Sequence, residues 1–260
     1  MVTRIHTVIL TRNEAHNIAR AVASARPLGD VTVIDSESGD ETVAVARNAG
    51  AAIIVHPWPG FAAQRKYALE TIAAEWILFL DADEEITPEL ALEISSIPFD
   101  ANGYFIRRRS LFLGGWMRHG SWGRDRVMRL FKRSMAHIED RPVHEEVTVT
   151  GTTKTLNAWM LHYSQGDFAE VGRKFTMYVP LMAEEISGRR DAIGGAEIAG
   201  RGLSSFARDY ILRRGFLDGW RGFVLAFWGM ASVVAKYAEA RRILETPERE
   251  KKSANRPPTI

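Results

Sequence analysis

Cysteine does not occur in this chain of 260 residues. The absence of thiols excludes a disulfide framework and a zinc–thiolate site. A large excess of one charge is missing too, because 34 basic and 32 acidic side chains leave a formal net charge of +2. That near balance gives no reason to expect a nucleic-acid partner. The length suffices for one large domain with a substantial extension.

Long apolar runs are also missing from the sequence. The longest, residues 223–235, contains Gly229 and Ser232 and falls short of the ~20 residues that a membrane-spanning helix needs. Residues 1–6 lead straight into a predicted strand, without the basic and then apolar pattern of a signal peptide. We therefore expect a cytoplasmic protein that is at most peripheral on the inner face of the cell membrane.

No glycine-rich phosphate-binding loop is present. The pattern G-x-G-x-x-G does not follow the first predicted strand, and G-x-x-x-x-G-K-[ST] occurs nowhere in the chain. A dinucleotide-dependent dehydrogenase or a P-loop NTPase is therefore not expected. If a nucleotide binds, a metal ion and basic side chains have to hold its phosphates.

Short apolar stretches alternate with helical patterns through the first third of the chain. Strands are expected at residues 6–10, 31–35, 52–55 and 76–80, and helices at residues 15–25, 40–48 and 64–74. This alternation with short connections predicts an α/β fold with a mainly parallel, doubly wound sheet. The strand at 76–80 is apolar throughout, as in a strand buried on both faces.

Polar side chains follow three of these strands at one edge of the predicted sheet, where ligands bind in open α/β folds. They are residues 11–14, Asp35, and the pair Asp81 and Asp83. An extended backbone would aim Asp81 and Asp83 in the same direction, and two such carboxylates suit Mg²⁺ or Mn²⁺ carrying a phosphate. The alternative is structural: the acids at 81–85 begin the next helix, and Asp35 caps the turn at 38–42.

Three ordered motifs resemble the family 2 glycosyltransferases: T-V-I-L-T-R-N-E-A-H-N-I at residues 7–18, V-I-D-S-E-S-G-D-E-T at 33–42 and I-L-F-L-D-A-D-E at 77–84. Within that family the chain is most similar to lipopolysaccharide core β-glucosyltransferases of the WaaE/KdtX type. The resemblance implies a GT-A fold, a nucleotide-diphospho sugar, a divalent metal and inversion of the anomeric centre. It covers most of residues 1–165, the expected catalytic domain.

The same resemblance implies roles for individual residues. Asp35 would contact the base or ribose, and Arg65 matches a basic position that faces the nucleotide. Lys66 departs from the asparagine expected at its position, which leaves its role open. The full set expected to bind the nucleotide is Thr11, Asn13, Glu14, Asp35, Arg65 and Asp81.

The expected metal ligands are Asp81, Asp83 and His162. His162 matches a histidine that follows the sheet in the family, and an imidazole ligand would favour Mn²⁺ over Mg²⁺. A structural histidine in the core or at a hinge is the alternative at that position.

An inverting transfer needs one base to take the proton from the attacking hydroxyl. The segment V-H-E-E at residues 143–146 resembles the family's V-H-E element, and R-L-F at 129–131 resembles the element before it. Glu145 is the expected base, with Glu146 as its rival and Asp125 as a further candidate. Adjacent strand residues face opposite sides, so only one of the two glutamates can face the site. For this pair, a solvated strand end is the alternative.

The last part of the chain is expected to form a helical extension over residues 166–245 and a disordered tail over 246–260. Helices are expected at 168–187, 203–213 and 223–244, with a glycine-rich loop at 188–202. Basic, aromatic-rich residues at 206–220 suit contact with an anionic membrane. For residues 223–235 the alternative, packing on the catalytic domain or on a second subunit, is preferred.

Together these patterns predict an inverting glycosyltransferase. It would move a hexose, with glucose as the expected sugar, from a UDP-sugar to a lipid-linked saccharide such as the lipopolysaccharide inner core. One alternative is a nucleotidyltransferase, although the early glycine-rich basic loop of that class is not visible. Another is a non-catalytic GT-A-like membrane adaptor. Homo-oligomerisation stays open.

Overall fold

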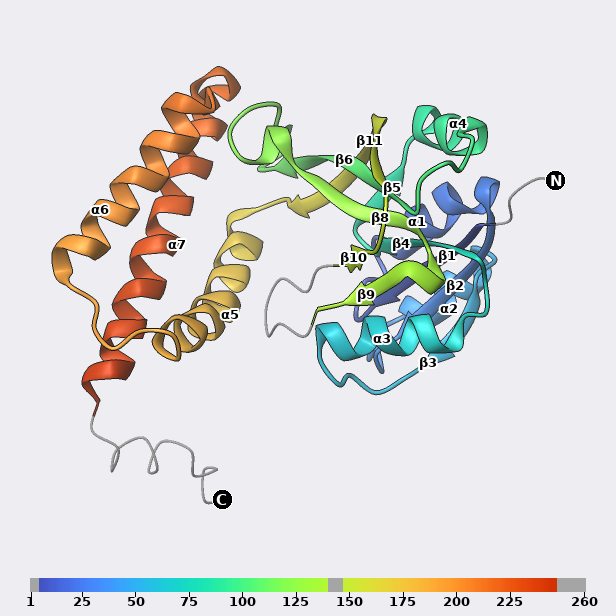
Figure 1. The fold of residues 1–260 in the computed structure, drawn as a ribbon, viewed down its shortest axis with the longest axis horizontal. Coiled ribbons are helices and arrows are strands. Elements are labelled where there is room, and N and C mark those ends of the chain that lie inside the picture. The colour runs from blue at the N-terminus through green and yellow to red at the C-terminus, as the bar shows by residue number, and fades with distance from the viewer. Residues whose placement is uncertain (1–4, 140–146, 247–260) are drawn as a thin grey trace. The chain divides into compact units, whose positions relative to one another are not determined.

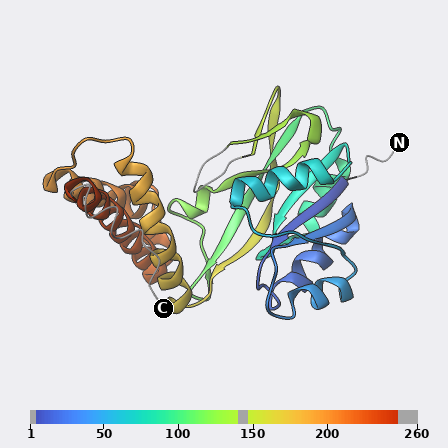
Figure 2. The ribbon, with the colours of Figure 1, turned by 90° about the horizontal axis from the view of Figure 1, so that it is seen from below.

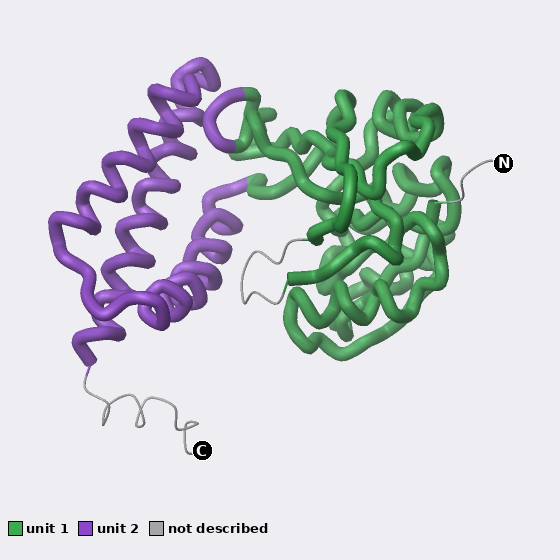
Figure 3. The backbone as a smooth tube through the Cα atoms, viewed as in Figure 1, with its two compact units in different colours: residues 1–118, 122–166 green, residues 119–121, 167–260 purple. Residues whose placement is uncertain are grey.

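The structure is a computed structural model that describes residues 5–139 and 147–246. The chain divides into two compact units (Figure 3). Unit 1 comprises residues up to Arg118 and Trp122–Gly166, and unit 2 comprises His119–Ser121 and the residues from Asp167 onward. Each unit has its own apolar core.

Unit 1 is built on one large sheet whose strands follow the order β3-β2-β1-β4-β8-β6-β11-β5 (Figure 1). Neighbouring strands β3, β2, β1 and β4 are parallel, and so are β6 and β11, whereas β8 runs antiparallel to both of its neighbours. The predicted mainly parallel α/β sheet of GT-A type is therefore confirmed. The bounds of the main strands are β1 (Ile5–Thr11), β2 (Gly29–Asp35), β3 (Ala52–Val55), β4 (Trp76–Asp81), β5 (Glu84–Ile86), β6 (Gly103–Phe112), β8 (Arg126–Lys132) and β11 (Thr153–Gln165).

Helices cover both faces of this sheet (Figure 2). The core on one face includes residues of α1 (Ile18–Ala25), α2 (Thr42–Asn48) and α4 (Pro88–Ser96). The core on the other face includes residues of α3 (Phe61–Thr71) and is covered by the two-stranded sheet of β9 (Ala136–Ile138) and β10 (Val147–Val149). A short strand, β7 (Gly115–Trp116), pairs with β6 outside the main order.

Strand β4 is the centre of unit 1. Trp76, Leu78 and Leu80 belong to the core on one face, and Ile77 and Phe79 belong to the core on the other. This alternation follows from the two-residue period of an extended chain, and it explains why all five positions are apolar. The buried strand fixes where its last residue, and the acids that follow it, emerge from the sheet.

The interpretation of Glu84 and Glu85 as a helix start is wrong. Residues Glu84–Ile86 form strand β5, which pairs antiparallel with β11, and His162 lies opposite Glu84 in that pairing. Helix α4 begins only at Pro88, where the Thr87 side chain accepts a hydrogen bond from the Leu90 backbone N–H. A non-local strand partner thus overrides the local pattern of acids before a helix.

Unit 2 is helical. The expected glycine-rich loop at 188–202 is only partly right, because α6 begins at Gly195 and continues as a π-helix after Phe206. A Cβ atom at Gly202 would lie 2.6 Å from the Val234 side chain, so glycine permits a close approach of α6 to α7. The helices are α5 (Phe168–Ser187), α6 (Gly195–Phe206), the π-helix Ala207–Leu212, a 3₁₀ turn at Gly215–Asp218 and α7 (Gly219–Glu245).

The short segment His119–Ser121 belongs to unit 2 although its chain neighbours belong to unit 1. The Asp218 carboxylate lies 2.8 Å from His119 Nδ1 and also accepts a hydrogen bond from the His119 backbone N–H. The Gly120 N–H donates to the Arg213 carbonyl at 2.9 Å. These contacts tie the segment to the turn before α7.

The expectation that no helix could span a membrane is wrong, because one helix has the length and the composition that spanning requires. The stretch Gly215–Glu245 is long and apolar enough to do so, and 11% of its most apolar part is buried. Gly229 and Ser232 interrupt the apolar run in the sequence, but the helix continues through them, and small residues lower the average hydropathy only slightly.

Candidate active site

Three strand ends meet at one edge of the sheet in unit 1. Thr11 lies opposite Asp35 in the β1–β2 pairing, and Leu10 lies opposite Asp81 in the β1–β4 pairing. The parallel register therefore brings the polar residues after β1, β2 and β4 together, as the sequence predicts. This edge is where open α/β sheets bind their ligands.

The loops after β1 and β2 hold each other in place. The Asn13 N–H donates to Ser38 Oγ, and the Gly39 N–H donates to Asn13 Oδ1, both at 2.8 Å. Asp35 is buried and accepts hydrogen bonds from both the N–H and the hydroxyl of Ser38, at 2.8 and 2.5 Å. Asp35 therefore has the structural role of the alternative interpretation, and its contact with a base or ribose stays a prediction.

Two further residues of the predicted nucleoside pocket lie at the same edge. Thr11 Oγ1 is buried and has no hydrogen-bond partner among the residues that the structure describes. The Glu14 N–H donates to Thr42 Oγ1 at 2.8 Å, and its carboxylate accepts a hydrogen bond from the Asn17 amide. An orphaned hydroxyl at a strand end is available to a ligand atom, because buried polar groups normally find a partner.

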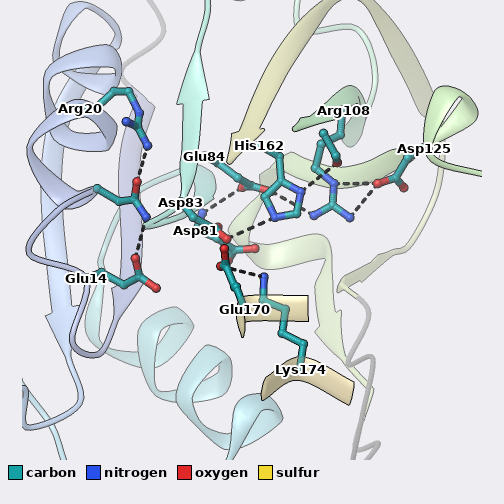
Figure 4. Close-up of polar contacts among 12 residues, drawn as sticks. Glu14, Arg20, Asp81, Asp83, Glu84, Arg108, Asp125, His162, Glu170 and Lys174 are labelled. Atoms are coloured by element: carbon teal, nitrogen blue, oxygen red, sulfur yellow. Dashed lines mark hydrogen bonds and ion pairs between the residues drawn. The ribbon is translucent and has the colours of Figure 1, made fainter. Parts of the chain in front are cut away.

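A chain of alternating charges lies at this edge, and Figure 4 shows the part of it that runs from Glu84 through Arg108 to Asp125. Arg129 Nη2 lies 2.6 Å from Glu84 Oε1 and also contacts the Asp81 carboxylate. Arg108 bridges Glu84, at 3.2 Å, and the Asp125 carboxylate, at 2.7 Å. The order of the chain is Arg65, Asp81, Arg129, Glu84, Arg108 and Asp125.

Burial makes these pairings strong determinants of ionisation. The Glu84 side chain is 0% exposed and is paired with two arginines. Burial opposes the ionised form of Asp81, but the guanidinium groups of Arg129 and then Arg65 outweigh it and hold the pKa of that carboxyl well below its usual range. Asp81 is thus a fixed negative charge whose two oxygens both face arginines.

Arg129 reaches this chain because of a β-bulge. In the β6–β8 pairing, Tyr104 lies opposite Leu130 and Phe105 lies opposite Met128, so Arg129 is the extra residue. Bulges redirect side chains and are frequent beside active sites. No role was predicted for Arg129, although its place in the R-L-F element is a signal, nor for Glu84, which ends the motif at 77–84, and no local pattern marks Arg108.

Asp83 and His162 form a second centre next to this chain, and they point toward one another in Figure 4. His162 Nε2 lies 3.3 Å from the Asp83 carboxylate, and the opposite ring nitrogen, Nδ1, lies 3.0 Å from Ser110 Oγ. Ser110 is buried and lies directly across from His162 in the β6–β11 pairing. The ring is therefore oriented with Nε2 toward the carboxylate.

The three predicted metal ligands are only partly brought together. Asp83 and His162 offer one oxygen and one nitrogen on the same side, a pair that fits Mn²⁺ and, through the carboxylate, Mg²⁺. Asp81 is turned to its arginines instead. Within residues 5–139 and 147–246, no three or more histidine or acidic side chains converge on one point, so solvent or substrate oxygens would have to complete the coordination.

The predicted base lies outside the described residues, and so do its rival Glu146 and its neighbour His144. Asp125, the further candidate, is described. Its Oδ2 accepts hydrogen bonds from Arg108 at 2.7 Å, and the Arg108 N–H donates to its backbone carbonyl. Asp125 therefore serves to anchor Arg108, and Glu145 stays the predicted base.

Comparison with known proteins gives the class of this protein. The sequence model of glycosyl transferase family 2 matches residues 7–150, and the chain belongs to that family. An uncharacterised glycosyltransferase of Rickettsia prowazekii is 29% identical over 97% of this chain and 89% of its own. A lipopolysaccharide core biosynthesis glycosyltransferase, LpsC of Rhizobium meliloti, is 25% identical over 88% of this chain and 92% of its own.

Solved structures to which the chain is similar include glucosyl-3-phosphoglycerate synthase from Mycobacterium tuberculosis. Its complex with Mg²⁺ and UDP is 19% identical, covering 51% of this chain and 57% of that one, with a TM-score of 0.36. A complex with Mn²⁺, UDP and glucosyl-3-phosphoglycerate is 22% identical, covering 44% of this chain and 45% of that one, with a TM-score of 0.33.

Proposed function

We propose that this glycosyltransferase is an inverting, metal-dependent enzyme that moves a hexose from a UDP-sugar to a lipid-linked saccharide. The observation that carries the proposal is the Asp83–His162 pair beside a buried chain of carboxylates and guanidinium groups, at the edge where β1, β2 and β4 end. Membership of family 2 supports the transfer of a sugar.

Asp83 and His162 would hold the metal, through a carboxylate oxygen and Nε2. When bound, Mn²⁺ or Mg²⁺ would supply Lewis-acid neutralisation of the leaving diphosphate. Ser110 Oγ, 3.0 Å from Nδ1, would keep the imidazole in place by accepting a hydrogen bond from Nδ1–H, in the tautomer whose Nε2 lone pair can bind a cation. Asp81 would face the ribose while its negative charge keeps Arg65 and Arg129 oriented.

The remaining roles follow the order of the strand ends. Thr11, Asn13 and Glu14 would line the nucleoside pocket, with the unpartnered Thr11 hydroxyl as one contact. Glu145 would take the proton from the acceptor hydroxyl as that oxygen attacks the anomeric carbon, and the configuration inverts in this single displacement. Glucose is the proposed hexose, and the lipopolysaccharide core is the proposed location of the acceptor, in keeping with the name of the Rhizobium relative.

Turnover of nucleotide sugars tests the proposal. The full chain is incubated with UDP-glucose, UDP-galactose and GDP-mannose, with Mn²⁺ or with a chelator, and release of UDP, or of GDP from GDP-mannose, is measured. We expect UDP-glucose hydrolysis that depends on the metal and is faster than with the other sugars. Failure to release UDP from any of them would contradict the proposal. Pyrophosphate release from UTP and glucose 1-phosphate would instead identify a nucleotidyltransferase.

We also propose that unit 2 contacts an anionic membrane peripherally. Leu212 is 74% exposed and Trp220 is 55% exposed, and exposed apolar side chains of this size mark an interaction surface when they gather. Arginines 213, 214 and 221 lie at intervals among them, as in interfacial helices that bind anionic lipid. The apolar surface comprises Ile211, Leu212, Phe216, Leu217, Trp220, Phe223 and Phe227.

Exchange of Phe216 and Trp220 for serine should release the protein from vesicles. Each side chain is about half exposed, so the fold should survive, and the loss of both should weaken binding about tenfold or more. Flotation with phosphatidylglycerol vesicles measures this, with Leu92→Ser, also highly exposed, as the matched control. Unchanged flotation would contradict the proposal. Resistance of the natural chain to alkaline extraction would show that α7 spans the membrane instead.

A further inference from the structure

Three arginines gather on one face of the sheet in unit 1, away from the chain of charges. Arg107 on β6 lies directly opposite Arg126 on β8, and Arg109 is two residues farther along β6 on the same face. Like charges at directly opposed strand positions destabilise a sheet. The stability of the fold therefore does not explain why arginines stand at these positions.

The surroundings of the three arginines differ sharply from those of Arg108. That residue lies between Arg107 and Arg109 in the sequence, and its side chain faces the opposite side of the sheet. Arg108 pairs with two carboxylates, whereas none of the three other arginines forms an ion pair with any residue that the structure describes. Arg107 and Arg126 are exposed, and Arg109 is half-buried. Among residues 5–139 and 147–246, the face thus presents three positive charges that no carboxylate pairs with.

These guanidinium groups are held in place by aromatic rings. The Arg109 guanidinium lies 4.6 Å from the centre of the Trp159 ring, and that of Arg107 lies 5.8 Å from it. The Arg126 guanidinium lies 5.0 Å from the Phe105 ring and donates a hydrogen bond to Thr155 Oγ1 at 3.0 Å. Stacking orients a guanidinium and leaves its N–H groups free to bind an anion.

We propose that Arg107, Arg109 and Arg126 bind an oxyanion, a phosphate or a carboxylate, carried by the saccharide acceptor. This rests on the proposed function for the nature of the acceptor. Guanidinium groups bind such anions through paired hydrogen bonds, and the partly exposed Trp159 ring beside them suits the apolar face of a sugar. A flat ring within the anion site favours a saccharide over a lipid headgroup.

The position of the three arginines limits which part of the acceptor they bind. Arg108 and Ser110 face the candidate active site, so Arg107 and Arg109, which alternate with them on β6, face away from it. The anion is therefore a group remote from the hydroxyl that attacks. Binding energy from such a remote group selects the acceptor without touching the sugar that is transferred.

Binding of small probes tests the site directly. With UDP and Mn²⁺ present at saturation, the full chain is titrated calorimetrically with glucose 6-phosphate, glucuronate, glucose and inorganic phosphate. We expect glucose 6-phosphate and glucuronate to bind and glucose to bind at least about tenfold more weakly, because the charged hydrogen bonds are lost. Inorganic phosphate should bind more weakly than the sugar phosphate, and equal affinity would overturn the saccharide part of the proposal.

A double variant, Arg107→Gln with Arg126→Gln, should weaken glucose 6-phosphate binding about tenfold or more and leave UDP-glucose hydrolysis unchanged. Arg47→Gln, an exposed arginine on α2, is the matched control and should change neither. Unchanged affinity in the double variant overturns the proposal, as does loss of binding when UDP fills its own site. If the natural chain binds the probes but hydrolyses no UDP-sugar, the proposed function fails while the anion site stands.

Discussion

Asparagine at position 83 is expected to reduce metal-dependent release of UDP by about a thousandfold. The exchange keeps the shape of the side chain but removes the carboxylate that lies 3.3 Å from His162 Nε2. A metal at a leaving diphosphate is worth several kcal/mol of transition-state stabilisation, and about 4 kcal/mol corresponds to three orders of magnitude in rate. The measurement is kcat for UDP-glucose hydrolysis across a Mn²⁺ titration.

Two further variants separate metal binding from simple damage to the fold. His162→Gln should weaken Mn²⁺ binding strongly, whereas Ser110→Ala should weaken it by about 10–100-fold, because it removes only the group that orients the imidazole. Binding of Mn²⁺ is followed by its electron paramagnetic resonance signal, independently of turnover. Equal Mn²⁺ affinity in the natural chain and in Asp83→Asn would rule out this assignment.

Removal of the Glu84 carboxylate should be the most destabilising single change among the ionic residues of unit 1. Glu84→Ala leaves Arg129 and Arg108 buried without their shared partner and also removes the acceptor of the Asp81 N–H. Breaking a buried ion pair in this way costs about 3–5 kcal/mol. The free energy of unfolding is measured by urea titration, monitored by tryptophan fluorescence.

Two further variants serve as controls for the loss of stability expected for Glu84→Ala. Glu84→Gln keeps the volume and one accepting oxygen, so it should lose less stability than alanine does. Asp125→Asn affects the partly exposed end of the same chain of charges and should cost about 1 kcal/mol or less. A loss below about 1 kcal/mol for Glu84→Ala would mean that water replaces the missing carboxylate and that the chain of charges adds little to the fold.

The sequence predicts the sheet and its ligand-binding edge well, because both depend on local signals. Residues 76–80 of β4 are apolar because both faces of the strand are buried there, and Asp81 and Asp83 follow them directly in the chain. Asp35 and Thr11 come to the same edge through the parallel register alone. These features need only the alternation of strands and helices and the rule that parallel strands end together.

The partners of those acids could not be predicted in the same way. Arg129 reaches Asp81 through a bulge in the β6–β8 pairing, and Glu84 is buried because β5 pairs with β11. Ser110 meets His162 only when β6 and β11 lie side by side. Each of these contacts joins segments far apart in the sequence, and no local spacing marks them. The same holds for α6, in which Gly202 permits the close approach of α7.

The placement of residues 119–121 has a practical consequence for dissecting the enzyme. A truncated chain that stops after Gly166 would retain His119 but lose the Asp218 carboxylate, and Gly120 would lose the Arg213 carbonyl. The stretch between β7 and β8 would then lack its anchor and become a target for proteases. Soluble expression of the chain up to Gly166 alone would therefore require redesign of the stretch between β7 and β8 as well as the truncation.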